Sequence, residues 1–327
     1  MKSLIKNFLS KFNFIRKYYS GLGTVLMLHR VSDFEKDKMS TNENLKVSPE
    51  FLEKTIIKLK NNNYEFISLD RLYQILKNGE NVKKQIVFTL DDGYKDNFEN
   101  AYPIFKKYNI PFTVYITTSF PEKRALLWWY ILEDLLINNS ELILSNGEKY
   151  NCFSTIEKIQ TFMKIREIII SLEANTFLKK LNELFSNYSI NWYKYNDELT
   201  MNWEDIQKLS QDEIVTIGGH TNNHFAFNRL SKDEILKEVS DANKLIEQKI
   251  GKKVHHFSYP FGSRNEIGPR EFKIIKSLNF KTVTTTREGC VYHAHNSFTE
   301  CIPRIMLTEK FKITDVGKIR KQRIVTF

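Results

Sequence analysis

Two adjacent aspartates, Asp91 and Asp92, stand where an apolar run stops in the segment FTLDDGYKDN, residues 88–97. Neighbouring carboxylates repel each other unless positive charge lies beside them. A divalent cation relieves this repulsion by binding one carboxylate, and the other is then free to accept a proton. Taken alone, the segment is equally compatible with one aspartate capping the following helix and the other being solvated.

Two histidines four residues apart form the second candidate motif, GGHTNNH, residues 218–224. On one helical turn, His220 and His224 share a face, so both imidazoles can reach a single ion. The glycines before them allow the backbone to turn sharply. The same spacing also arises on ordinary surface helices. Together with the aspartates, it predicts an Asp–His–His site with open positions, the arrangement of a hydrolytic zinc centre.

A turn at the end of a third apolar run, HFSYPFG at residues 256–262, is the last candidate motif. A turn at a strand end can present an unpaired backbone N–H, which can stabilise a developing oxyanion. By itself this is a common turn. Its value depends on whether the fold brings it to the other two motifs.

Alternating elements are expected to position these motifs. We expect strands at residues 24–29, 64–68, 85–90, 112–117, 214–217, 255–259 and 281–284. We expect helices at residues 49–61, 69–77, 97–108, 203–209, 232–250 and 271–278. This alternation predicts an α/β fold with a parallel sheet, open or closed into a barrel. In such folds the chemistry lies at the carboxyl ends of the strands, and there the chain places His29, Asp91, Asp92, His220 and Phe261.

A stretch of different rhythm interrupts the alternation at about residues 120–200, with helical patterns at 128–137, 156–172 and 176–185. It contains Trp128, Trp129 and Trp192, and Trp203 follows it. Aromatic faces can stack on sugar rings, but most of these side chains are expected to pack the helices onto the barrel. We expect one tryptophan to contact substrate.

In this order, FTLDDGYKDN, HTNNH and SYPFG resemble the first three motifs of the polysaccharide deacetylases, the NodB-homology carbohydrate esterases of family 4. The resemblance runs from about residue 22 to residue 307, with the helical stretch as an interruption. It implies a distorted (β/α) barrel with a helical insertion and a bound divalent metal, most often Zn²⁺, with Ni²⁺ and Co²⁺ as alternatives. It also implies Asp92, His220 and His224 as metal ligands, Asp91 as catalytic base and Thr221 as a support of the histidine loop.

The chain departs from the family pattern at three places. Phe261 stands where the family usually has Tyr, but its backbone amide can still supply the oxyanion contact. The arginine usual before the third motif is missing, and Arg304, in IPRI, can supply a guanidinium from another strand. The family's late LxH motif, the source of the general acid, resembles LMLH ending at His29, as in some biofilm-polysaccharide deacetylases of permuted order. His29 is therefore assigned as general acid, with His295 as the alternative.

These assignments predict a hydrolase that removes an acetyl group from an N-acetylated sugar of a polysaccharide or lipid-linked glycan, within glycan biosynthesis. Two alternatives stay open. The same barrel can hydrolyse a non-sugar amide, or it can be a non-catalytic relic that binds sugars. The formal net charge of +10 invites a nucleic-acid partner, but no nucleic-acid recognition motif is present, so none is expected.

Both ends of the chain are basic. Residues 1–20 combine five basic residues and no acid with an apolar stripe at helical spacing. This stripe predicts a helix that either lies on an anionic membrane surface or packs on the protein's own core. Without a signal peptide or membrane-spanning run, we expect a cytoplasmic protein, with membrane association through residues 1–20 if the first alternative holds. The expected layout is this helix, a barrel at residues 21–310 and a basic tail at 311–327.

Overall fold

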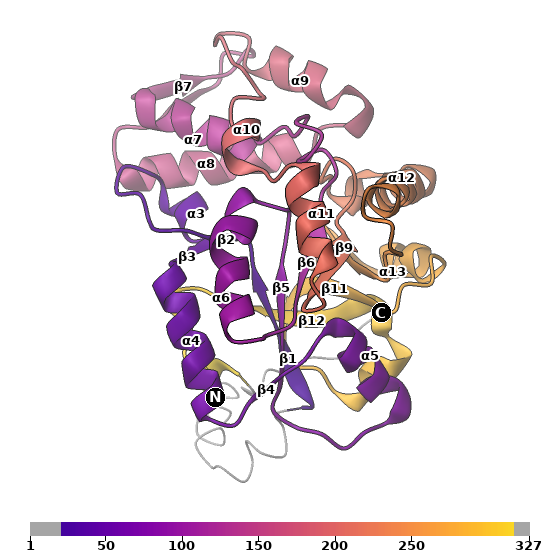
Figure 1. Cartoon of the computed structure of the whole chain (residues 1–327). Coiled ribbons are helices and arrows are strands. Elements are labelled where there is room, and N and C mark those ends of the chain that lie inside the picture. Colours follow the sequence, from indigo (N-terminus) through magenta and orange to yellow (C-terminus); the bar gives the residue numbers. More distant parts are fainter. Residues whose placement is uncertain (1–20, 317–327) are drawn as a thin grey trace, which may run out of the picture.

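A barrel of seven parallel strands forms the centre of the molecule, for which a computed structural model describes residues 21–316 (Figure 1). Around the barrel the strands follow the order β1 (Gly23–Leu28), β12 (Ile302–Met306), β11 (Thr282–Glu288), β10 (His256–Ser258), β9 (Val215–Gly219), β6 (Phe112–Ile116) and β5 (Gln85–Leu90). A pairing between β5 and β1 closes the ring. A short strand, β4 (Glu65–Phe66), extends β5 outside it. The expected (β/α) barrel is confirmed, and of the two alternatives the closed form is the one observed.

The closure between β1 and β5 depends on a close backbone approach at Gly23. The two strands pair in register from Gly23 opposite Gln85 to Leu28 opposite Leu90. A Cβ atom at Gly23 would lie 2.2 Å from the carbonyl oxygen of Gln85. Because this contact is with backbone, no side-chain rotation relieves it. Only glycine fits at this point of the seam.

Gly23→Ala is therefore expected to lower the free energy of unfolding by about 1–3 kcal/mol, as overpacking does in a tight interior. Urea denaturation followed by circular dichroism measures this change. Gly268→Ala is the matched control, because a Cβ there would meet its nearest neighbour at an ordinary 3.5 Å. Equal stability of the two variants would show that the barrel seam can widen without cost.

Helices surround the barrel, as expected from the alternation. They are α4 (Pro49–Asn61), α5 (Leu69–Asn78), α6 (Tyr102–Lys107), α11 (Trp203–Gln211), α12 (Lys232–Ile250) and α13 (Pro269–Lys276). Local sequence signals account for several of their ends. Ser48 caps α4 ahead of a proline, and α12 begins with a capping box from Ser231 and ends at Gly251 in the left-handed conformation.

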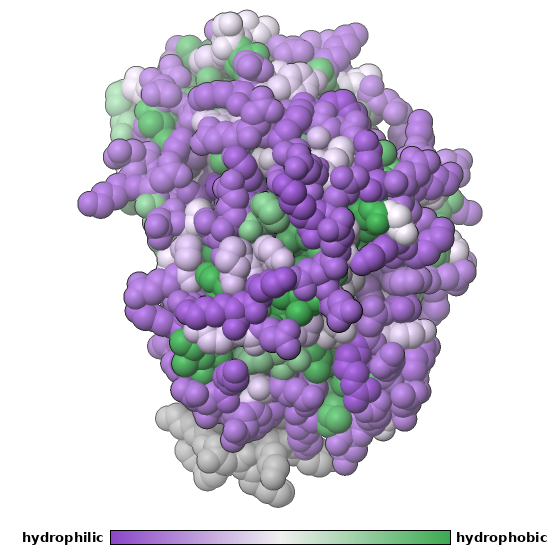
Figure 2. Space-filling model, in the orientation of Figure 1, coloured by the Kyte–Doolittle hydropathy of each residue, from purple (hydrophilic) through white to green (hydrophobic). Residues whose placement is uncertain are grey.

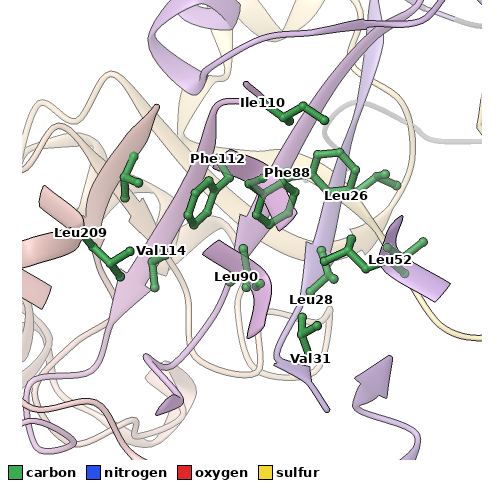
Figure 3. Close-up of a cluster of buried hydrophobic side chains, with 14 of the residues drawn as sticks. Leu26, Leu28, Val31, Leu52, Phe88, Leu90, Ile110, Phe112, Val114 and Leu209 are labelled. Atoms are coloured by element: carbon green, nitrogen blue, oxygen red, sulfur yellow. The ribbon is translucent and has the colours of Figure 1, made fainter. Parts of the chain in front are cut away.

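The largest apolar cluster lies between the barrel strands and these helices (Figure 3). Phe88 on β5 packs against Phe105 at a ring-centroid distance of 5.1 Å, and Phe105 stacks on Phe112 of β6 at 4.5 Å. Leu52 from α4 and Leu209 from α11 extend the cluster on either side. This packing holds the carboxyl ends of β5 and β6 in a fixed position.

The interruption at about residues 120–200 forms a second layer with its own apolar cluster at one end of the barrel (Figure 1). It contains α7 (Trp128–Asn138), α8 (Thr155–Ile170), α9 (Phe177–Leu184) and α10 (Asn196–Leu199). The first three correspond to the expected helices. A hairpin of β7 (Glu141–Ile143) and β8 (Lys149–Asn151) lies between α7 and α8 and is not anticipated by the sequence pattern, because three residues are too few to show alternation.

Short elements complete the described chain. They are β2 (Arg30–Val31), β3 (Lys46–Val47), α3 (Ser40–Glu43), a π-helical turn η1 (Asn97–Ala101) ahead of α6, and the 3₁₀ turns η2 (Ala174–Thr176), η3 (Phe227–Arg229), η4 (His293–Ser297), η5 (Thr299–Cys301) and η6 (Ile313–Asp315).

The two basic ends lie largely outside the described residues. The predicted helix at residues 1–20 and residues 317–327 of the predicted tail remain predictions for that reason. Within residues 21–316, none of the helices combines the length and the apolar character needed to cross a bilayer. Hydrophilic side chains cover most of the face shown in Figure 2.

Candidate metal centre and active site

The turn after β5 aims two carboxylates in different directions. Asp92 has a φ of 77°, in the left-handed region that a non-glycine residue adopts only at a cost, and Gly93 follows at 93°. Such backbone strain is often found at functional sites, where the surrounding structure enforces it. Both aspartates are buried, at 2% and 4% exposure. The turn therefore separates the two side chains and gives each its own surroundings.

His220 and His224 meet Asp92 through a loop and not through a helical turn. The Nε2 atom of each imidazole lies 3.3 Å from Oδ1 of Asp92. Residues 220–226 are not helical, so the expectation of one helical face is wrong. Instead, Thr221 and His224 have φ values of 67° and 60°, and these left-handed residues fold the second histidine back toward the first. The Thr221 hydroxyl accepts a hydrogen bond from the His224 amide at 3.0 Å and stabilises this loop.

The three side chains fit a divalent metal ion. One ligand atom from each of Asp92, His220 and His224 lies within 4.8 Å of the other two. Among the described residues, Asp92 Oδ1 is buried and has no hydrogen-bond partner. The Nδ1–H of His220 donates to the carbonyl oxygen of Ser258 at 2.7 Å, which leaves the Nε2 lone pair directed at the site. A carboxylate and two imidazoles are the donor set that suits zinc.

The electrostatics of this cluster also favour a cation. Burial lowers the pKa of His220, but the carboxylates of Asp92 and Asp91 outweigh it, so the net shift is upward. Burial raises the pKa of Asp92, but His224 and His220 lower it by more than burial raises it. The net pKa of Asp92 is well below its usual range. The electrostatic potential at the site is therefore negative, and either protons or a bound metal ion can neutralise it.

Asp91 is held by a buried arginine from the far end of the chain. Nη1 and Nη2 of Arg304 donate to the two carboxylate oxygens of Asp91, both at 2.6 Å. Arg304 also donates to the Thr89 and Ser258 hydroxyls and to the Thr285 carbonyl oxygen. Burial raises the pKa of Asp91, but the guanidinium more than offsets this effect and lowers it overall. Asp91 is thus ionised at neutral pH and fixed in orientation beside the metal ligands.

His29 follows the end of β1 and faces the same space. Desolvation lowers the pKa of His29, and the carboxylates of Asp92 and Asp91 offset part of that effect. Its Nδ1 atom has no hydrogen-bond partner among the described residues. His29 is therefore held close to the two aspartates with an imidazole nitrogen available.

His295, the alternative general acid, lies at the opposite end of the barrel. Val291, which precedes His295 by four residues in the chain, pairs with Gly23 at the start of β1, whereas His29 follows the last residue of that strand. His295 is buried, its Nδ1 accepts from the Tyr292 amide, and burial lowers its pKa to about 4. It does not line the cavity at the metal ligands, so His29 is the better candidate.

Phe261 forms part of the wall beside His224. Its φ of 59° is again left-handed, and its ring centroid lies 4.9 Å from that of His224. Its carbonyl oxygen accepts from the Thr286 hydroxyl at 2.6 Å. The constrained backbone brings the third motif next to the other two, as the positions of the strand ends predict.

A cavity of about 350 Å³ joins these groups. From the barrel and nearby loops it is lined by Met27, His29, Thr41, Asn42, Leu45, Asp91, Asp92, Tyr94, His220, His224, Phe261, Thr286 and Met306, and from the insertion by Trp128, Trp129, Phe162, Met163 and Arg166. The Trp129 indole donates to the Tyr94 hydroxyl at 3.2 Å, and its ring lies 5.8 Å from that of His224. The insertion thus covers the carboxyl ends of the strands. Tyr94 and Arg166 carry no signal in the sequence that marks them as site residues.

Comparison with known proteins agrees with this geometry. The polysaccharide deacetylase family model matches residues 78–144 and 173–283, which include both aspartates, both histidines and the third motif. The chain belongs to the polysaccharide deacetylase family. Over 301 residues it is 23% identical to poly-beta-1,6-N-acetyl-D-glucosamine N-deacetylase of Staphylococcus aureus, covering 90% of this chain and 81% of that protein. It is 27% identical over 266 residues to the putative polysaccharide deacetylase YxkH of Bacillus subtilis, covering 81% of this chain and 64% of that protein.

Solved structures show the same fold. The deacetylase PplD of Streptococcus pyogenes, determined in complex with acetate, superposes with a TM-score of 0.61 at 19% identity, covering 91% of this chain and 98% of that one. IcaB from Ammonifex degensii superposes with a TM-score of 0.56 at 14% identity, again covering 91% and 98%. This polysaccharide deacetylase therefore has the barrel of its relatives. Residues 145–172, which include α8, fall between the two segments that the family model matches.

In this polysaccharide deacetylase, Arg304→Lys is expected to lower kcat by about 10–100-fold, because lysine cannot form the two parallel bonds that orient Asp91. The pKa of Asp91 is lowered by Arg304, so weakening that pair raises the pKa. The acid limb of the pH–rate profile then moves to higher pH, since Asp91 takes up its proton sooner as the pH falls. Because the pKa of Asp91 is lowered below its ordinary value in the unchanged protein, a profile of kcat/KM from about pH 3 to about pH 8 measures this shift. An unchanged acid limb would mean that Asp91 does not control it.

Proposed function

We propose that this polysaccharide deacetylase is a metal-dependent hydrolase that removes the acetyl group from an N-acetylated sugar of a polysaccharide or lipid-linked glycan. The observation that carries the proposal is the cluster of Asp92, His220 and His224, with the ionised Asp91 beside it. Zn²⁺ is the ion that we expect. The activity named for the Staphylococcus aureus relative supports an N-acetylated glucosamine polymer as substrate.

Each side chain has a task in this proposal. Asp92, His220 and His224 would hold the ion, which supplies electrophilic activation of the acetyl carbonyl and of a water molecule. Asp91 accepts the proton of the attacking water at its carboxylate, and Arg304 holds that carboxylate in position. The backbone N–H of Phe261 donates to the oxyanion that develops on the acetyl group.

His29 completes the reaction by donating a proton to the departing sugar nitrogen. An amine leaves poorly unless it is protonated as the C–N bond breaks. The pKa of His29 is lowered in the free protein, so its proton is readily given up once it is acquired. The proton that Asp91 takes from water balances the proton that His29 donates. The products are the free amine of the sugar and acetic acid, which ionises to acetate by releasing its proton to solvent.

The fold also supports different roles for the barrel and for the helical insertion. We propose that residues 21–310 form the deacetylase unit and that the insertion at about residues 120–200 acts as a cap over it. Trp129 is the tryptophan that we expect to contact substrate, because it lines the cavity and lies against His224.

An acetate-release assay tests the proposed function. The zinc-loaded protein is incubated with N-acetylglucosamine oligomers and, separately, with lipid-linked N-acetylated sugars, before and after treatment with a chelator. Acetate release that stops on chelation and returns with Zn²⁺ is the expected result. Hydrolysis of simple non-sugar amides, without acetate release from any sugar, would favour a hydrolase of non-sugar amides. Sugar binding without turnover and without bound metal would favour a non-catalytic protein that binds sugars.

A further inference from the structure

Helix α8 places a positively charged side chain in the cavity that contains the proposed metal ligands. Arg166, near the C-terminal end of α8, lines this cavity together with Phe162 and Met163 from the same helix. The helix lies within residues 145–172, which the family model does not match. Arg166 therefore enters the cavity from outside the segments that the family model matches, so it is a candidate for selecting the substrate.

The Arg166 guanidinium lies within reach of a sugar bound at the metal centre. It is placed over the Phe261 ring at 5.5 Å, and the His224 ring lies 4.9 Å from the same Phe261 ring. The distance from the guanidinium to His224 therefore cannot exceed the sum of these two values, which is about the span of two sugar rings. The Arg166 side chain is 25% exposed, so its charged end can still meet a ligand.

Among the residues from 21 to 316 that line the cavity, none forms an ion pair with Arg166. Of the carboxylates that line it, Asp91 is bound at both oxygens by Arg304, and Asp92 faces the two histidines. Among the described residues, the hydrogen-bond partner of Arg166 is Glu167, which is 68% exposed and does not line the cavity. An ion pair so exposed contributes little. An uncharged N-acetylated sugar offers nothing to neutralise the guanidinium.

We propose that Arg166 selects substrates that carry an anionic group, a phosphate or a carboxylate, on the sugar that is deacetylated or on its immediate neighbour. Both groups present paired oxygens, which the planar guanidinium binds through two parallel hydrogen bonds. The Phe261 ring beneath the guanidinium holds it in place by a cation–π contact. This inference rests on the proposed deacetylase function and narrows its substrate class.

Rates on matched neutral and anionic substrates test the inference. The zinc-loaded protein is assayed for acetate release from neutral N-acetylglucosamine oligomers, from the disaccharide of N-acetylglucosamine and N-acetylmuramic acid, and from N-acetylglucosamine oligomers with a 1-phosphate. We expect kcat/KM to be at least about 10-fold higher for one or both anionic substrates, as a hydrogen bond to a charged group predicts. The carboxylate and phosphate arms show which anion is recognised.

Substitutions on α8 link this preference to Arg166. Arg166→Gln is expected to reduce the ratio of anionic to neutral kcat/KM to about one, and Arg166→Lys to keep part of it, because the charge remains without the planar geometry. Lys164→Gln is the matched control. It removes a positive charge from the same helix at an exposed residue that does not line the cavity, so the ratio should stay unchanged.

Binding is measured in parallel, so that the inference is tested even without turnover. Calorimetric titration of the zinc-loaded protein with N-acetylglucosamine and its 1-phosphate should show tighter binding of the phosphate, lost in Arg166→Gln. Deacetylation of all substrates at equal rates would overturn the inference and leave the proposed function intact. A phosphate preference that survives in Arg166→Gln would assign the anion to the metal and also overturn the inference. Absence of acetate release from every N-acetylated sugar would count against the proposed function instead.

Discussion

Asp91→Asn is expected to lower kcat by about 10²–10⁴-fold while the protein still binds one metal ion per chain. Asparagine has the shape of aspartate but cannot accept the proton of the attacking water. The three proposed ligands, Asp92, His220 and His224, are untouched by the substitution. Acetate release and metal analysis of the same preparation measure the two properties together.

The same substitution changes the surroundings of Arg304, which requires a check on folding. Arg304 is 1% exposed and now donates to both oxygens of Asp91. An asparagine amide satisfies only one of these bonds and leaves the buried guanidinium without its counter-charge, so stability should fall. Urea denaturation shows whether the variant is folded under assay conditions.

Asp92→Asn is the matched comparison for Asp91→Asn. It alters the neighbouring carboxylate, which faces the histidines, and should lose metal as well as activity. If instead Asp91→Asn loses the metal and Asp92→Asn retains it, the roles of the two aspartates are exchanged.

Removal of one imidazole is expected to have an effect of comparable size. His224→Ala should weaken Zn²⁺ binding by more than about 100-fold, because about 100-fold is the largest loss expected when only a residue that hydrogen-bonds to a metal ligand is removed. With one Zn²⁺ ion added per chain, acetate release should be abolished. The Nε2 atom of His224 lies 3.3 Å from Asp92 Oδ1, and the remaining two ligands cannot hold a tetrahedral ion alone. Calorimetric titration of chelator-treated protein with Zn²⁺ measures the affinity.

His255→Ala provides the control for the loss of a histidine. His255 is exposed and lies outside the cavity, so both Zn²⁺ affinity and activity should match those of the unchanged protein. Full activity of chelator-treated protein, or normal Zn²⁺ affinity in His224→Ala, would exclude the proposed metal centre.

Local patterns in the sequence determined the helices and strands of this protein and the places along the chain where its candidate site residues stand. The bounds of β5 and α12 follow from a short apolar run and from helical periodicity between Ser231 and Gly251. Parallel strands share one carboxyl end, so motifs that follow different strands were expected to meet, and Asp92, His220 and His224 do meet. The motifs themselves predicted an Asp–His–His metal site, and the family resemblance added which aspartate binds the metal and which acts as the base.

The tertiary structure alone decided how these residues reach one another. Left-handed φ values at Thr221, His224 and Phe261, which no periodic pattern encodes, replace the expected helical turn and shape the site. Arg304 reaches Asp91 across 213 residues of chain, and Arg166 enters the cavity from an inserted helix. Sequence windows report local preference, whereas such contacts depend on how strands close into a barrel and on which side chains the closed barrel then faces.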